Sequence, residues 1–192
     1  GTVDITAVFT QTGGSTVLNG GAIAIGGGSG TATFSGGTLQ GSGTFSGTVV
    51  NNGATIKPGT TAGLLTIAGI LTQGAGGIIE IDIGGTTALT QYDRLVVTGV
   101  ATLNGTLRAK LINSFVPVLN TDFQVMTFAS KSGTFSTLDT VTSALLTYFS
   151  TTLSATSATF RSKSFPSVSI AAALSTNEST AVTGTVSISD AD

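Results

Sequence analysis

The sequence predicts an all-β protein: a right-handed parallel β-helix (β-solenoid) of short coils with glycine at their corners, closed by a more aromatic β cap. Val, Ile, Thr and Gly dominate the chain, and charged residues make up 8% of it, against about 25% in an ordinary soluble domain. Such a composition favours strands and tight turns over helices. Repeated units fill the first part of the chain, and the larger aromatic side chains gather in the second. The handedness follows from the general chirality of crossovers between parallel strands.

Five consecutive units of equal length, each ending in glycine, tile the first part of the chain: 6–21, 22–37, 38–53, 54–69 and 70–85. Most units carry two apolar clusters, such as Ile23 with Ile25 and then Ala32 with Phe34. Two short strands cannot bury an apolar face alone, but stacked units share one continuous core. We therefore assign 1–85 to coils with this 16-residue period. Whether one unit is a whole coil stays open, and hairpins in a meander would space their turns in a similar way.

The 16-residue repeat ends at residue 85, and two further regions follow. Residues 86–93 are expected to form a loop, 94–112 a strand, a turn and a strand, and the rest of 86–164 further short strands. Because the aromatic residues lie here, 86–164 is interpreted as the continuation and cap of the β-helix. Residues 165–192 are expected to form a linker and an edge strand that leads to a following domain or a neighbouring subunit.

Composition excludes several classes of partner and of chemistry. The net charge is −2 with only seven basic residues, which argues against a nucleic-acid partner. No apolar run is long enough to span a membrane. The chain contains neither histidine nor cysteine, so it cannot build a Ser-His-Asp site or a typical zinc site. We expect no catalytic residue and no bound cofactor, and the absence of cysteine is common in exported proteins.

The stretch "IIEIDIGG" places Glu80 and Asp82 at alternate positions of a strand. Side chains two apart on a strand lie about 6.5–7 Å apart, near the roughly 6.5–9.5 Å that separates the two carboxylates of an inverting glycosidase. A catalytic pair would also need one raised pKa, and apart from Lys57 no basic residue is expected on adjacent coils. Because the alternation along the strand directs Ile79, Ile81 and Ile83 toward the core, we expect the two acids to face solvent together with Ile78. A carbohydrate or Ca²⁺ contact is the functional alternative.

Two other groups of polar residues are candidate binding spots. In "QYDRL", Asp93 and Arg94 could pair across a turn with Tyr92 packed over the loop; the favoured alternative is a turn in which Asp93 accepts backbone N–H groups. Asp190 and Asp192 could supply oxygen ligands to Ca²⁺ at a C-terminal junction, although two carboxylates do not fill its shell. They are weak candidates for a metal site.

Residues 50–136 resemble the β-helix stalk and cap unit of large bacterial surface adhesins and autotransporter-type passengers. The resemblance lies in "KPGTTAGLLTIAG", then "LTQGAGGIIEIDIGG", then "YDRLVVTGVATLNGTLRAKL", a Phe-Pro turn region and a terminal "GTF" strand. Here Pro58 lacks the second Pro-Gly step usual in that pattern. The tail "STNESTAVTGTVSISDAD" resembles the opening of a VCBS-type repeat. The resemblance implies a parallel β-helix at a bacterial cell surface, and it brings no catalytic residue.

The expected function is therefore structural. The chain would serve as a stalk or assembly module of an exported bacterial adhesin, or of an extracellular or biofilm fibre. Its expected partners are neighbouring copies or domains of the same fibre, and surface glycans are a further candidate. The alternative is a carbohydrate-binding or polysaccharide-degrading β-helix protein.

Overall fold

The computed structural model describes residues 1–140, 147–165, 167–170 and 186–189. The strands in chain order are β1 (Thr2–Ile5), β2 (Phe9–Gln11), β3 (Ser15–Ile25), β4 (Thr31–Phe34), β5 (Thr38–Ser46), β6 (Thr48–Asn51), β7 (Thr55–Pro58), β8 (Leu64–Ala68), β9 (Leu71–Gln73), β10 (Ile78–Ile83), β11 (Arg94–Leu103), β12 (Thr106–Leu111), β13 (Asp122–Gly133), β14 (Thr137–Asp139), β15 (Thr147–Leu153), β16 (Ser157–Ser164), β17 (Ser167–Ile170) and β18 (Val186–Ser189). A single 3₁₀ turn, η1 (Gly26–Gly28), is the only helical element among the described residues. The prediction of an all-β chain is confirmed.

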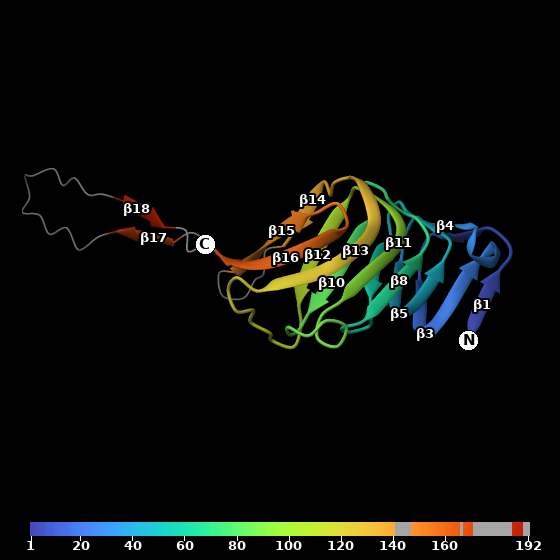
Figure 1. Cartoon of the computed structure of the whole chain (residues 1–192), viewed down its shortest axis with the longest axis horizontal. Helices are drawn as coiled ribbons and strands as arrows, with labels where there is room; N and C mark the ends of the chain where they lie inside the picture. The colour runs from blue at the N-terminus through green and yellow to red at the C-terminus, as the bar shows by residue number, and fades with distance from the viewer. Residues whose placement is uncertain (141–146, 166, 171–185, 190–192) are drawn as a thin grey trace, which may run out of the picture.

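Parallel strands stack in three columns, so that the chain follows a parallel β-helix (Figure 1). The first column contains the start of β3, the start of β5, β7, β10, β12 and β14. The second contains β1, the ends of β3 and β5, β8, and the starts of β11 and β13. The third contains β2, β4, β6, β9, and the ends of β11 and β13. Every pairing within these columns is parallel, which rules out a meander of hairpins for this part of the chain.

The length of a coil varies along the chain, so it does not follow the constant period of the sequence units. Thr38 pairs with Thr55, whereas Ser15 pairs with Thr38 and is separated from it by a longer stretch of chain. The stretch between Leu95 and its partner Met126 is longer still. The later coils are longer because residues 84–93 and 112–121 form loops between the first and second columns. The repeated units therefore mark strands and corners and are not complete coils.

The core lies inside the coil and follows from the alternation of side chains along each strand. Ile79, Ile81 and Ile83 of β10 are fully buried, as the alternation predicts. Aromatic rings fill both ends of the core. Phe9, Phe34 and Phe45 form one group, with ring centroids 5.4 to 6.3 Å apart.

The direction of pairing changes at β16, which pairs antiparallel with β13 on one side and with β15 on the other. We call β15 and β16 the cap strands. Their aromatic core contains Phe123, which lies 5.7 Å from Phe149 between ring centroids, and Phe160, which stacks on Phe149 at 5.6 Å. The cap strands therefore extend the sheet beyond the last parallel strand of the second column.

Gly41 shows why some corners need glycine. Its φ is 103°, and a Cβ at this position would overlap the carbonyl oxygen of Leu18 on the preceding coil. We expect Gly41→Ala to lower the free energy of unfolding by about 1–3 kcal/mol, measured by urea unfolding. Gly13→Ala is the matched control, because nothing lies within 4 Å of the added Cβ there. Equal stability of the two variants would contradict this explanation.

Candidate functional site

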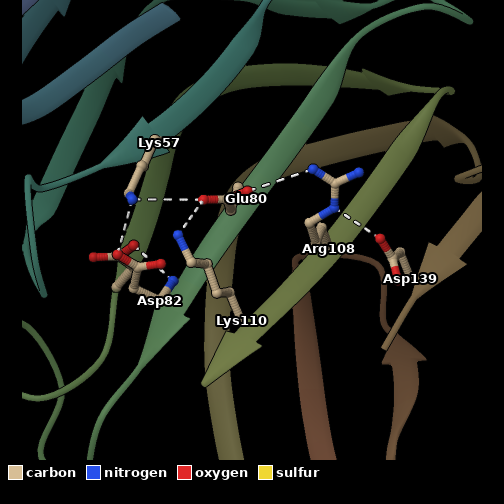
Figure 2. Close-up of polar contacts among 7 residues, drawn as sticks. Lys57, Glu80, Asp82, Arg108, Lys110 and Asp139 are labelled. Atoms are coloured by element: carbon tan, nitrogen blue, oxygen red, sulfur yellow. Dashed lines mark hydrogen bonds and ion pairs between the residues drawn. The ribbon is translucent and has the colours of Figure 1, made fainter. Parts of the chain in front are cut away.

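Six charged side chains form a ladder on the outer face of the first column, and we name this group the charge ladder (Figure 2). Its members are Lys57 on β7, Glu80 and Asp82 on β10, Arg108 and Lys110 on β12, and Asp139 on β14. The register places Glu80 beside Arg108, Asp82 beside Lys110, and Arg108 beside Asp139. Because these strands are parallel and in register, residues that alternate along one strand meet partners that alternate along the next.

The ladder is a continuous chain of ion pairs. Lys57 Nζ lies 3.0 Å from Asp82 Oδ2 and 3.5 Å from Glu80 Oε1. Glu80 also forms ion pairs with β12: its Oε2 lies 3.4 Å from Arg108 Nη1, and its Oε1 lies 3.5 Å from Lys110 Nζ. Arg108 Nε then donates to Asp139 Oδ2 at 2.7 Å. Three cations and three anions balance one another, so the ladder carries no net charge.

The pKa values follow from these contacts. Burial alone would raise the pKa of Glu80, but Lys110, Lys57 and Arg108 together hold it below its ordinary value. Burial likewise opposes the charge of Lys57, but the hydrogen bond and charge of Asp82 raise the pKa of the amine. Lys57 is therefore a protonated counter-ion at neutral pH and not a general base.

The expectation that Glu80 and Asp82 both face solvent is wrong for Asp82. Its exposed fraction is 2%, and the Glu80 side chain is only 14% exposed. The loop 84–93 folds back along the end of β10, where the N–H of Asp93 donates to the carbonyl of Asp82 at 3.0 Å. Lys57 reaches Asp82 from the preceding coil. The prediction that no basic residue other than Lys57 lies nearby is also wrong, since β12 contributes Arg108 and Lys110.

The buried carboxyl group of Asp93 connects two coils through hydrogen bonds. Its Oδ1 accepts the N–H of Gly63 at 2.8 Å, and its Oδ2 accepts the N–H of Asp82 at 2.8 Å. Burial, with a contribution from the charge of Asp82, raises the pKa of Asp93 to about 8 despite the two backbone hydrogen bonds. Asp93 therefore accepts backbone N–H groups, as the favoured alternative states, but from β10 and a distant corner rather than from its own turn.

The neighbours of Asp93 complete the corner. The guanidinium of Arg94 donates to Gln124 Oε1 at 2.8 Å and not to the neighbouring Asp93. Tyr92 packs edge-on against Phe123 in the core, with centroids 5.3 Å apart. The residues of "QYDRL" thus join the coils to β13 and its aromatic core.

The ladder is poorly suited to hydrolysis of a glycosidic bond. A general acid of an inverting pair needs a raised pKa, whereas that of Glu80 is lowered. Asp82 is buried against Lys57, which leaves little room for a water or a sugar. Among the described residues, no group of three or more acidic side chains lies close enough to hold a metal ion. Asp190 and Asp192, the weak Ca²⁺ candidates, lie outside the described residues.

Sequence reasoning missed half of the ladder, although a signal was present. "TLRAKL" alternates Arg108 and Lys110 with the same period of two as Glu80 and Asp82. Arg108 lies beside Glu80 in the register of β10 and β12, and one whole coil separates the two residues in the sequence. The equal units of the sequence do not bring them together, because that coil is longer than one unit.

A second polar group was also missed, inside the third column. Asn51 is fully buried; its side-chain N–H donates to Gln73 Oε1 at 3.0 Å, and its Oδ1 accepts the N–H of Ala54 at 2.9 Å. The side-chain amides of Asn51 and Gln73 connect two adjacent coils at the corner between the third and first columns. Their contacts are structural.

Comparison with protein-family models and with curated protein sequences finds no match. Among the described residues, no helix is long and apolar enough to cross a membrane.

Proposed function

We propose that this chain is a structural segment of an exported bacterial cell-surface adhesin or extracellular fibre, in which it acts as a stalk or an assembly module. The observation that carries the proposal is the charge ladder, where ionic side chains neutralise one another across β7, β10, β12 and β14. These charged groups take one another as partners and connect successive coils, which supports a structural role.

The remaining outer surface supports the same function. In the third column, Thr10 pairs with Thr33, and Thr72 pairs with Thr102. The Ser132 hydroxyl donates to Thr102 Oγ1 at 3.2 Å. Neutral, hydroxyl-rich rows of this kind suit an elongated segment that is exposed to solvent along its length. The resemblance of residues 50–136 to stalk and cap units of surface adhesins agrees with this proposal.

Labelling of intact cells tests where the chain is displayed. Antibodies against the purified chain should bind non-permeabilised cells of the producing organism, and added protease should remove the signal. Labelling that appears only after permeabilisation would contradict the proposal.

Carbohydrate binding is the second candidate, favoured by an aromatic pair of which Tyr148 lies on β15 and Phe165 follows β16. Tyr148 and Phe165 lie 5.1 Å apart between ring centroids, and Phe165 is 40% exposed. Exposed rings can stack on sugars through their apolar faces. A glycan array with the wild-type chain and with Phe165→Ala tests this candidate; Val118→Ala, at a 74% exposed aliphatic residue, is the control. Binding that only Phe165→Ala abolishes would support glycan recognition.

A further inference from the structure

The outer face of the third column carries a regular row of threonine and similar side chains. Thr33 of β4 lies beside Val50 of β6, which in turn lies beside Thr72 of β9. Thr72 lies beside Thr102 of β11, and the row ends at Ser132 of β13. Because these strands are parallel and in register, neighbours in the row lie about 4.8 Å apart.

A second row runs beside the first, two residues earlier on each strand. Thr31 pairs with Thr48, and Val100 pairs with Ser130. The register of β9 with β6 and β11 places Ile70 between Thr48 and Val100. Side chains two apart on a strand share a face and lie about 6.5–7 Å apart. The two rows therefore form a two-dimensional array, which we call the outer array.

The outer array is uncharged, and its side chains are held in fixed positions. Threonine, valine or isoleucine occupies every position except Ser130 and Ser132. These β-branched side chains are stiff at χ1, and their strands are anchored from inside by Ala32, Val49 and Leu71, which are fully buried. Methyl groups and hydroxyls therefore recur at constant spacings in two directions.

The hydroxyls of the outer array are available to water. Among the described residues, those of Thr33, Thr48 and Thr72 have no hydrogen-bond partner in the protein. The methyl groups also reach solvent, since Ile70 is 43% exposed and Val100 is 40% exposed. The surface thus combines exposed methyl groups with hydroxyls that bond only to water.

A protein or a sugar fits the outer array poorly. The cores of protein interfaces are enriched in aromatic residues and arginine, and the array contains neither. It extends over about 19 Å along the column and about 7 Å across it, far less than the roughly 800 Å² that each partner of a stable complex buries. Without an aromatic ring, it also offers no platform on which a sugar stacks.

We propose that the outer array binds the surface of ice. Planes of ice repeat in two directions, at distances close to the strand spacing along each row and to the separation between the rows. Water held by the hydroxyls and ordered around the methyl groups then occupies positions that match those in the crystal. A periodic solid gains an equal contact at every position of the array, and an adsorbed chain blocks growth of the crystal beside it, so a small area is sufficient.

Thermal hysteresis and the shape of ice crystals in a solution of the purified chain test this inference. The wild type should lower the freezing point below the melting point and give faceted crystals. Thr72→Lys places bulk and charge in the middle of the outer array and should lose most of the hysteresis, as should Thr48→Lys in the second row. Thr66→Lys is the matched control and should keep it, because Thr66 is a half-buried threonine on β8 in the second column.

Two results would overturn the inference. One is a wild-type chain that gives no more hysteresis than serum albumin at the same concentration and leaves the crystals round. The other is an equal loss in Thr66→Lys and Thr72→Lys, which would place any contact with ice outside the outer array. Urea unfolding of each variant separates loss of binding from loss of the fold. Ice binding does not depend on where the chain is displayed, so this inference and the proposed function fail separately.

Discussion

Replacing Lys57 with methionine is expected to lower the free energy of unfolding by about 3–5 kcal/mol, the usual cost of removing one partner of a buried ion pair. The carboxylate of Asp82 would lose its ion pair at 3.0 Å with an exposed fraction of 2%. Its other oxygen, Oδ1, has no hydrogen-bond partner among the residues that the structure describes. Urea unfolding of the wild type and of Lys57→Met at pH 7 measures the difference.

Lys110→Met is the matched control at the other side of β10. Its side chain is 50% exposed and lies 3.5 Å from Glu80, so solvent screens the pair and the change should cost less than about 1 kcal/mol. Lys57→Met combined with Asp82→Leu should recover much of the lost stability, because no unpaired charge stays buried. Similar losses for Lys57→Met and Lys110→Met would show that burial of Asp82 does not govern the ladder.

The stability of the fold is expected to fall as pH rises from about 5 to 8, and Asp93 is the cause. Its pKa of about 8 lies above the ordinary value near 4, so over this range the folded chain retains a proton that the unfolded chain has lost. Stability contributed by the protonated carboxyl is then fully present below about pH 4 and disappears as pH passes about 8. The slope should approach about 1.4 kcal/mol per pH unit, the value for a single proton.

Glu80 shifts in the opposite direction and does not interfere with this measurement. Its pKa is lowered in the fold, so its contribution is present above about pH 4 and is lost only under more acidic conditions. Asp93→Asn should flatten the profile between pH 5 and 8, while Asp122→Asn, an exposed carboxylate paired with Arg161 at 3.4 Å, should leave it unchanged. Thermal unfolding across this pH range provides the readout. An unchanged slope in Asp93→Asn would exclude Asp93 as the titrating group.

The sequence predicts which side of a strand is buried, but not which residues of adjacent coils lie beside one another. The alternation in "IIEIDI" gives the buried side of β10, because Ile79, Ile81 and Ile83 share one face whatever lies beside the strand. The burial of Asp82 instead depends on how loop 84–93 folds back and on Lys57 from another coil. No local pattern contains that information.

Differences in coil length explain the other contacts that the sequence did not predict. The register between β10 and β12 depends on how many residues the intervening coil contains. The loop 84–93 lengthens that coil, so the 16-residue period does not predict which residues pair. Asn51 and Gln73 each stand in a stretch that resembles an ordinary Gly-containing turn. Their mutual hydrogen bond exists only because adjacent coils align them. Side chains fixed by contacts along a strand were thus predictable, whereas those fixed by contacts between coils were not.

Electron microscopy of native material, on or shed from the producing cells, tests the structural function most directly. Coils stacked along the long axis should give elongated bodies with a spacing of about 4.8 Å between strands along that axis. Filaments with an axial repeat near the length of one chain would indicate an assembling subunit, and isolated rods would indicate a stalk; either agrees with the proposed function. Dispersed compact particles that carry the chain, with no elongated structure, would contradict it.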